Sequence, residues 1–308
     1  MFVARPDRIN AAELEIRRRM VASARARKSR RKAPRAKPPT SIAVRYALAL
    51  SGLFDGFADQ VLSILDPHLA QLAEAAPLPR TDSIRLDAVS VDLIDRLIGD
   101  IGVALTQRIR PVAQLALEFG ADTARHNRTE TNRQFQALIG IDLPSNDPHL
   151  ADQLDLFRAG NVALITRMAD DTRGRITTTL TQAARQGLRV EEIRRQVQEA
   201  AGVSESRAEL IARDQVLKLN GELTQLRQRQ AGVTQYEWST SRDERVRGTP
   251  GGKWPTPAGG GGNHFDLEGK TFSWTDPPVV DTRTGRTAHP GEDFQCRCVA
   301  IPVITLPD

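Results

Sequence analysis

The chain has 308 residues, of which 40% are hydrophobic and 26% charged, enough for a packed core and about two domains. No stretch approaches the roughly 20 apolar residues needed to span a bilayer, and the basic N-terminus lacks the apolar segment of a signal peptide. We therefore expect no membrane partner and no secretion. The two cysteines, Cys296 and Cys298, cannot form a disulfide framework, whereas reduced thiols or metal ligation would suit a reducing cytoplasm.

The positive charge is concentrated at the N-terminus. Residues 1–40 hold 13 Lys and Arg against three acidic residues, a local balance of +10, whereas the whole chain carries +5 and the other 268 residues therefore carry −5. This basic arm has too few apolar residues to fold alone, so we expect it to be disordered in the free protein. It could also neutralise phosphates and bind double-stranded DNA without sequence preference.

Residues 41–188 show the periodicity of a helical body. One face of a predicted helix carries apolar residues at spacings of three and four: Ile94, Leu97, Ile98, Ile101, Leu105 and Ile109. Pro111 should kink or restart the helix. Beyond the body, the sequence predicts a helix that begins at Val190, a break at Gly202 and a further helix over residues 208–229.

Residues 189–308 are predicted to form a separate carboxy-terminal domain, because the composition changes within them. All three tryptophans and both cysteines lie after residue 235. Residues 235–240 alternate as a strand does, with Tyr236 and Trp238 on one face, and residues 248–262 are rich in glycine and proline, which predicts a loop. The fold class is therefore α+β: a mainly helical N-terminal body followed by a small α+β domain with few, irregular strands.

The cysteines and histidines of this domain are candidate metal ligands. Cys296 and Cys298 are two residues apart, so in an extended chain their thiols point to the same side. With His264 and His289 they could form a structural zinc site, which prefers four ligands in a tetrahedron, and Asp243 could complete it. The competing interpretation is that the thiols are small buried hydrophobes and the histidines are hydrogen-bonded core residues, since this spacing matches no standard zinc finger.

A cluster of charged residues follows the predicted strand. It contains Asp243, Glu244, Arg245 and Arg247. We favour an internal network of ion pairs that connects this cluster to the Cys-Arg-Cys segment through Arg297. The alternative is a catalytic carboxylate beside a substrate-holding arginine, as in a metal-dependent nuclease or hydrolase that would use the Asp/His/Cys residues of this domain. The sequence has neither a serine in a nucleophile elbow nor a Walker loop.

Several motifs occur in an order that is typical of one family. They are Ser206 to Asp214, Asn220-Gly221, Trp238 to Arg247, His264 to Phe272, Pro277-Pro278, His289 to Glu292 and Cys296-Arg297-Cys298. This ordered set resembles the phage Mu F-like head morphogenesis family over about residues 155–301. The motif residues for which the resemblance implies a structural role are Arg213, Trp238, Asp243, Arg245, Arg247, Gly269, Pro290, Gly291 and Arg297. The glycine-rich loop between Arg247 and His264 departs from the family, because it is short in many members.

The resemblance implies a role in assembling the head of a tailed phage or prophage. Members of this family are minor head proteins, encoded beside the portal protein in many tailed phages and prophages, and we expect this chain not to be an enzyme. The implied partners are the portal protein and the inner capsid or scaffold, and the implied location is the virion, inside the head or at the portal, with the host cytoplasm during assembly. Some relatives contact packaged DNA, which gives the basic arm an expected ligand.

Overall fold

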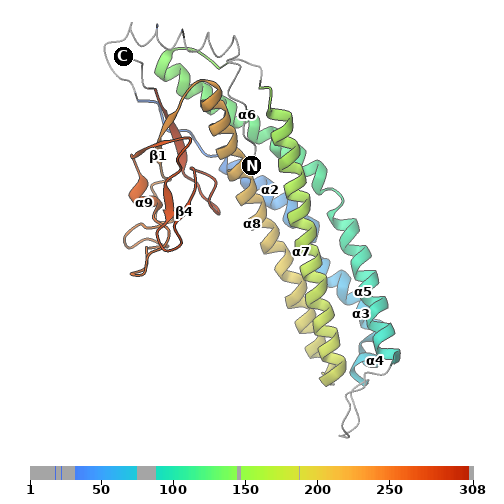
Figure 1. Ribbon diagram of the computed structural model, residues 1–308. Coiled ribbons are helices and arrows are strands. Elements are labelled where there is room, and N and C mark those ends of the chain that lie inside the picture. The colour runs from blue at the N-terminus through green and yellow to red at the C-terminus, as the bar shows by residue number, and fades with distance from the viewer. Residues whose placement is uncertain are drawn as a thin grey trace. The chain divides into compact units, whose positions relative to one another are not determined.

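The computed structural model describes residues 32–74, 88–143, 147–186 and 188–304, together with Arg18 and Ala22, which are helical (Figure 1). The chain is 64% helical and ends in a small region with a few antiparallel strands, which confirms the predicted α+β class. Most of the basic arm and the expected helix end at Gly187 lie outside the described residues. The predicted boundaries at residues 40 and 188 stay predictions.

Long helices make up most of the described chain. The helical elements are α2 (Thr40–Ser51), η1 (Gly52–Phe54), α3 (Phe57–Leu65), η2 (Asp66–His68), α4 (Leu69–Glu74), α5 (Ala88–Ile109), α6 (Val112–Ile139), α7 (Leu150–Gln186) and α8 (Val190–Gln230). The interruption at Pro111 and the start at Val190 are confirmed. The predicted break at Gly202 is wrong, since α8 continues through it; one glycine in a helix costs only about 1 kcal/mol relative to alanine.

The chain divides into two compact units, one of which is all helical. It comprises Val44–Glu118 and Leu156–Arg213. Its largest fully buried side chains are Tyr46, Leu50, Phe57, Leu65, Leu69, Leu72, Ile101, Ile165 and Met168. Two buried polar pairs connect its helices: the Tyr46 hydroxyl donates to Asn161 Oδ1 at 2.9 Å, and the hydroxyls of Thr172 and Ser204 lie 2.8 Å apart.

One described segment, Thr40–Ala73, is long enough to span a membrane and contains an 18-residue window with a mean hydropathy of 1.3, which is apolar enough to do so. The sequence-based expectation that no segment comes near such a composition was therefore wrong. The segment contains α2, α3 and most of α4, separated by the 3-10 turns η1 and η2. One such segment is weak evidence for a membrane, because a core helix of a soluble protein meets the same criteria.

The second unit holds the strands. It comprises residues 1–43, Phe119–Asp155 and Asp214–Asp308. Its three-stranded antiparallel sheet has the order β2-β1-β5, formed by Thr271–Ser273, Gln235–Ser239 and Val299–Val303, and a two-stranded ribbon pairs β3 (Val279–Asp281) with β4 (Arg286–Thr287). The strand predicted from the alternation of Tyr236 and Trp238 is confirmed as β1, and both side chains are fully buried in a core shared with Trp274 and Val280.

The last part of the predicted arm, residues 32–39, is not disordered but packs on α6. The backbone amide of Lys37 donates to the Glu130 carboxylate at 2.8 Å, and Arg133 donates to the carbonyl of Arg35 at 2.6 Å. This prediction failed because the extended, proline-rich chain offers backbone groups that α6 side chains can bind, which a count of apolar residues does not reveal.

Candidate metal centre

Three of the predicted ligands come together in the core of the carboxy-terminal region. The ligand atoms of His264, Cys296 and Cys298 all lie within 4.8 Å of one another, and all three residues are buried. His264 Nδ1 lies 3.5 Å from Cys296 Sγ and 3.6 Å from Cys298 Sγ. Two thiols therefore converge on the same ring nitrogen. We call this group the His-Cys-Cys cluster.

Local chain geometry places these side chains. His264 opens the short helix α9 (His264–Leu267), and its ring meets the edge of the Trp238 indole with centroids 5.4 Å apart. The two cysteines flank Arg297 just before β5, and the thiols face inward while Arg297 turns away and pairs with Asp243 at 2.8 Å. The predicted connection from the charged cluster to the Cys-Arg-Cys segment is thus present.

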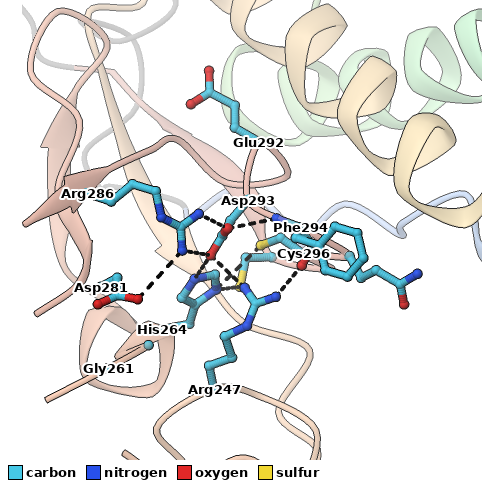
Figure 2. A network of polar contacts seen from close by, with 12 residues as sticks. Arg247, Gly261, His264, Asp281, Arg286, Glu292, Asp293, Phe294 and Cys296 are labelled. Carbon is cyan, nitrogen blue, oxygen red and sulfur yellow. Dashed lines mark hydrogen bonds and ion pairs between the residues drawn. The ribbon is translucent and has the colours of Figure 1, made fainter. Parts of the chain in front are cut away.

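A buried carboxylate holds the other side of the histidine ring. Asp293 Oδ2 lies 3.0 Å from His264 Nε2, and the Asp293 side chain is only 1% exposed (Figure 2). The carboxylate also receives hydrogen bonds from Arg247 Nη1 at 2.6 Å, from Arg286 and from the backbone amide of Phe294 at 2.7 Å. Because a carboxylate can only accept, Nε2 carries a proton, and Nδ1 is the ring nitrogen that faces the two sulfurs.

These contacts shift the titration of the whole group. Burial alone would lower the pKa of His264, but the hydrogen bond to Asp293 and the closeness of Cys296 outweigh it and raise the pKa to about 9. Burial would raise the pKa of Asp293, yet its bonds to His264 and the two arginines hold that pKa well below the usual range. The hydrogen bond from the second thiol lowers the pKa of Cys296, whereas burial raises that of Cys298.

Helix α8 fixes the segment that carries the cysteines. Asp214 Oδ1 accepts the backbone amide of Gln295 at 2.7 Å, and Gln295 holds the left-handed conformation, with φ of 51°. About two turns further along α8, Gly221 meets Gly291 so closely that a Cβ on Gly221 would lie 2.8 Å from the carbonyl oxygen of Pro290. The Asn-Gly and His-Pro-Gly motifs, distant in sequence, are therefore two sides of one contact.

His289, the fourth predicted ligand, is not part of the cluster. Its Nδ1 lies 2.8 Å from the Tyr236 hydroxyl, and its ring packs on Trp274 with centroids 4.9 Å apart. Burial lowers the pKa of His289. The structure thus places it as a hydrogen-bonded core histidine.

The remaining motif residues make contacts within the fold. Gly269 adopts φ of 74°, and its amide donates to the Trp238 carbonyl at 2.8 Å, which ends the turn into β2. Arg213 lies near Glu209 on the same helix face at 3.4 Å, and the Arg245 amide donates to Asp243 at 3.0 Å. Asp243 is therefore bound by Arg297 and by the chain around it, and it is not among the cluster's gathered ligands in the described residues.

Two residues of this site were missed in the sequence. Asp293 and Arg286 lie at the centre of the polar network, but no motif singled them out. The available signal was weak: an aspartate three residues before Cys296, beside Glu292 of the His-Pro-Gly-Glu motif.

The fold and the cluster define a class: a helical protein whose small α+β core is closed around one histidine and two cysteines. Residues 174–252 match the model of the family described as Phage Mu protein F like protein. Over these residues the chain is similar to the phage Mu F-like family. The matched residues cover the end of α7, α8, β1 and the start of the glycine-rich loop, whereas the cluster itself lies beyond them.

One relative of known sequence is an "Uncharacterized protein" of Haemophilus influenzae (strain Rd). It is 34% identical over 186 residues, which cover 59% of this chain and 37% of the relative. The chain thus matches little more than a third of that protein's length. No solved structure matches the chain.

Proposed function

We propose that the chain is a non-enzymatic protein of head assembly in a tailed phage or prophage. The observation that carries this proposal is the match of residues 174–252 to the family described as Phage Mu protein F like protein. The proposed locations are the inside of the head or the portal vertex, and the host cytoplasm while heads are built.

The chemistry of the carboxy-terminal region supports a structural role over a hydrolytic one. A hydrolase needs a carboxylate free to activate water beside its metal or nucleophile. Here Asp243 is bound by Arg297, and Asp293 is bound by Arg247 and Arg286. Carboxylates that are already paired with arginines stabilise the fold and have few lone pairs left to bind a substrate or activate water.

Genetics of the phage or prophage that encodes the chain tests this role. A strain with an early stop codon should release tails and head-related particles but few DNA-filled heads, seen by electron microscopy and by nuclease-protected DNA. A plasmid copy of the chain should restore them. A normal yield of filled heads from the stop-codon strain would refute the proposal.

Association with the portal or inner shell is the finer part of the proposal. Cross-linking of purified immature particles, followed by mass spectrometry, should join this chain to the portal protein or to inner capsid and scaffold proteins. Cross-links confined to tail proteins, or the absence of the chain from particles, would contradict it.

We further propose that the residues before Lys32 contact packaged DNA. These 31 residues hold ten Lys and Arg and could release counterions from the duplex. Deleting them should remove most nonspecific binding to double-stranded DNA and flatten the dependence of log K on log salt. A matched variant with the ten residues changed to Gln keeps the arm's length and should behave like the deletion. An unchanged salt slope in both variants would exclude the arm.

A further inference from the structure

We propose that the His-Cys-Cys cluster binds one zinc ion, with His264 Nδ1 and the sulfurs of Cys296 and Cys298 as its protein ligands and a buried water as the fourth. The site is structural: it closes the core of the carboxy-terminal region. This inference goes beyond the proposed role in head assembly and does not depend on it.

The distances within the cluster are those of a zinc site. With Zn–S about 2.3 Å and Zn–N about 2.0 Å, a tetrahedral angle places nitrogen and sulfur about 3.5 Å apart. The observed separations from His264 Nδ1 are 3.5 Å to one sulfur and 3.6 Å to the other. Both sulfurs therefore lie at the distance from Nδ1 that a shared zinc ion would set.

The residues behind the His264 ring already have the arrangement found around metal-binding histidines. Histidine ligands usually donate their other ring N–H to a carboxylate, which fixes the tautomer and raises the basicity of the coordinating nitrogen. His264 does this to Asp293 at 3.0 Å, and Asp293 is in turn held by Arg247 and Arg286 (Figure 2). The hydrogen bond to Asp293 therefore fixes the orientation of the His264 ring, with Nδ1 facing the two sulfurs.

Charge balance in the core also favours a divalent ion. Two thiolates and a neutral imidazole around Zn²⁺ sum to zero, so the group can be buried at a small electrostatic cost. The carboxylate behind the ring is compensated separately by its two arginines. Thiolate ligands disfavour Mg²⁺ and Ca²⁺, and the mixture of two sulfurs with one imidazole suits zinc among the common ions.

Burial decides between a structural and a catalytic site. His264, Cys296 and Cys298 are 2%, 4% and 7% exposed, and Trp238 packs over the histidine ring. A substrate cannot reach such a position without unfolding the core. The ion would connect α9 to the chain just before β5, two segments about 30 residues apart that also share an apolar core and the His264–Asp293 hydrogen bond.

The first test is the metal content of the full-length chain, purified without chelator from cells grown with zinc. We expect one zinc per chain by plasma mass spectrometry, and release of that zinc when a mercurial reagent titrates the two thiols. In the Co²⁺-exchanged protein, thiolate-to-cobalt charge transfer should appear near the ultraviolet and d–d bands of tetrahedral intensity in the visible. Less than one zinc in ten chains together with no charge-transfer band would overturn the proposal, and these readouts need no variant to fold.

Variants then assign the ligands. Cys296→Ser, Cys298→Ser and His264→Asn should each lose the bound zinc, whereas His289→Asn, a matched change at a buried histidine outside the cluster, should keep one zinc per chain. Asp293→Asn tests a positioning residue: it should weaken zinc affinity by about 10–100-fold in competition with a chelating dye, yet keep the charge-transfer band at saturating cobalt. Loss of zinc from His289→Asn with retention in His264→Asn would refute the ligand assignment.

Discussion

The contact between Gly221 and Gly291 makes a sharp prediction about a single methyl group. Replacing Gly221 by Ala adds a Cβ that would lie 2.8 Å from the carbonyl oxygen of Pro290 and 3.3 Å from the Gly291 Cα. Both neighbours are backbone atoms, which cannot turn aside as a flexible side chain can. Helix α8 and the His-Pro-Gly segment would have to separate.

Two effects of opposite sign set the size of the change. Alanine is favoured over glycine in a helix by about 1 kcal/mol, and overpacking a close contact costs about 1–3 kcal/mol. Gly221→Ala should therefore lower the free energy of unfolding by up to about 2 kcal/mol. The matched control is Gly202→Ala on the same helix, where the new Cβ would meet nothing within 4 Å. That variant should gain about 1 kcal/mol.

Urea denaturation of the wild type and the two variants, followed by tryptophan fluorescence, measures both changes. All three tryptophans lie in the carboxy-terminal region, so the signal reports the unit that contains Gly221, and far-ultraviolet circular dichroism follows the helix that carries Gly202. The expected midpoints shift in opposite directions. If Gly221→Ala were as stabilising as Gly202→Ala, the close approach of helix and loop would be refuted.

Three further changes test other contacts. Arg227→Met should lower the free energy of unfolding, measured by chemical denaturation, by about 3–5 kcal/mol, because it leaves the Asp147 carboxylate, only 6% exposed, without its ion-pair partner. The control Arg207→Met, whose acidic partner is exposed, should lower it by under about 1 kcal/mol. Equal losses of stability in the two variants would contradict the difference in burial. Burial alone would raise the pKa of Glu130, but hydrogen bonds from a neighbouring arginine and from the docked amino-terminal segment hold that pKa below its usual range. The ionised Glu130 carboxylate therefore stabilises the fold at any pH above its unfolded-state pKa, and this contribution is lost as the pH falls through its folded-state pKa. Glu130→Gln should thus destabilise the protein at pH 7 and much less in acid, and a pH-independent difference in unfolding free energy would oppose this. Tyr236→Phe removes a buried hydroxyl from its histidine partner and should cost about 1–3 kcal/mol, so an unchanged melting temperature would count against that bond.

Local patterns in the sequence predicted the features that depend on residues close together in the chain, such as strands, helix boundaries and the direction of side chains. The alternation of Tyr236 and Trp238 predicted β1, because a strand with one buried face repeats every two residues. The inward direction of Cys296 and Cys298, with Arg297 turned away, followed from the same alternation. Pro111 marked a helix boundary because its ring removes a hydrogen-bond donor.

Contacts between distant residues could not be predicted in this way. Asp293 holds the His264 ring only because Arg247, 46 residues earlier in the chain, and α9, which carries His264, are folded against it. His289 was equivalent to His264 by residue type, and only the fold decided that one faces the thiols while the other faces Tyr236. The docking of residues 32–39 depends on α6 side chains about 100 positions away.

The strand order has a consequence for the chain while it is still being made. β1 is the central strand, yet its partner β5 follows about 60 residues later, so at roughly 5–20 residues per second the ribosome adds that partner about 3–12 s after β1. During that interval the nascent chain presents Tyr236 and Trp238 on a strand with one unpaired edge, the arrangement that most readily recruits another chain. A ribosome-associated chaperone that holds this segment until β5 emerges would raise the yield of correctly folded protein.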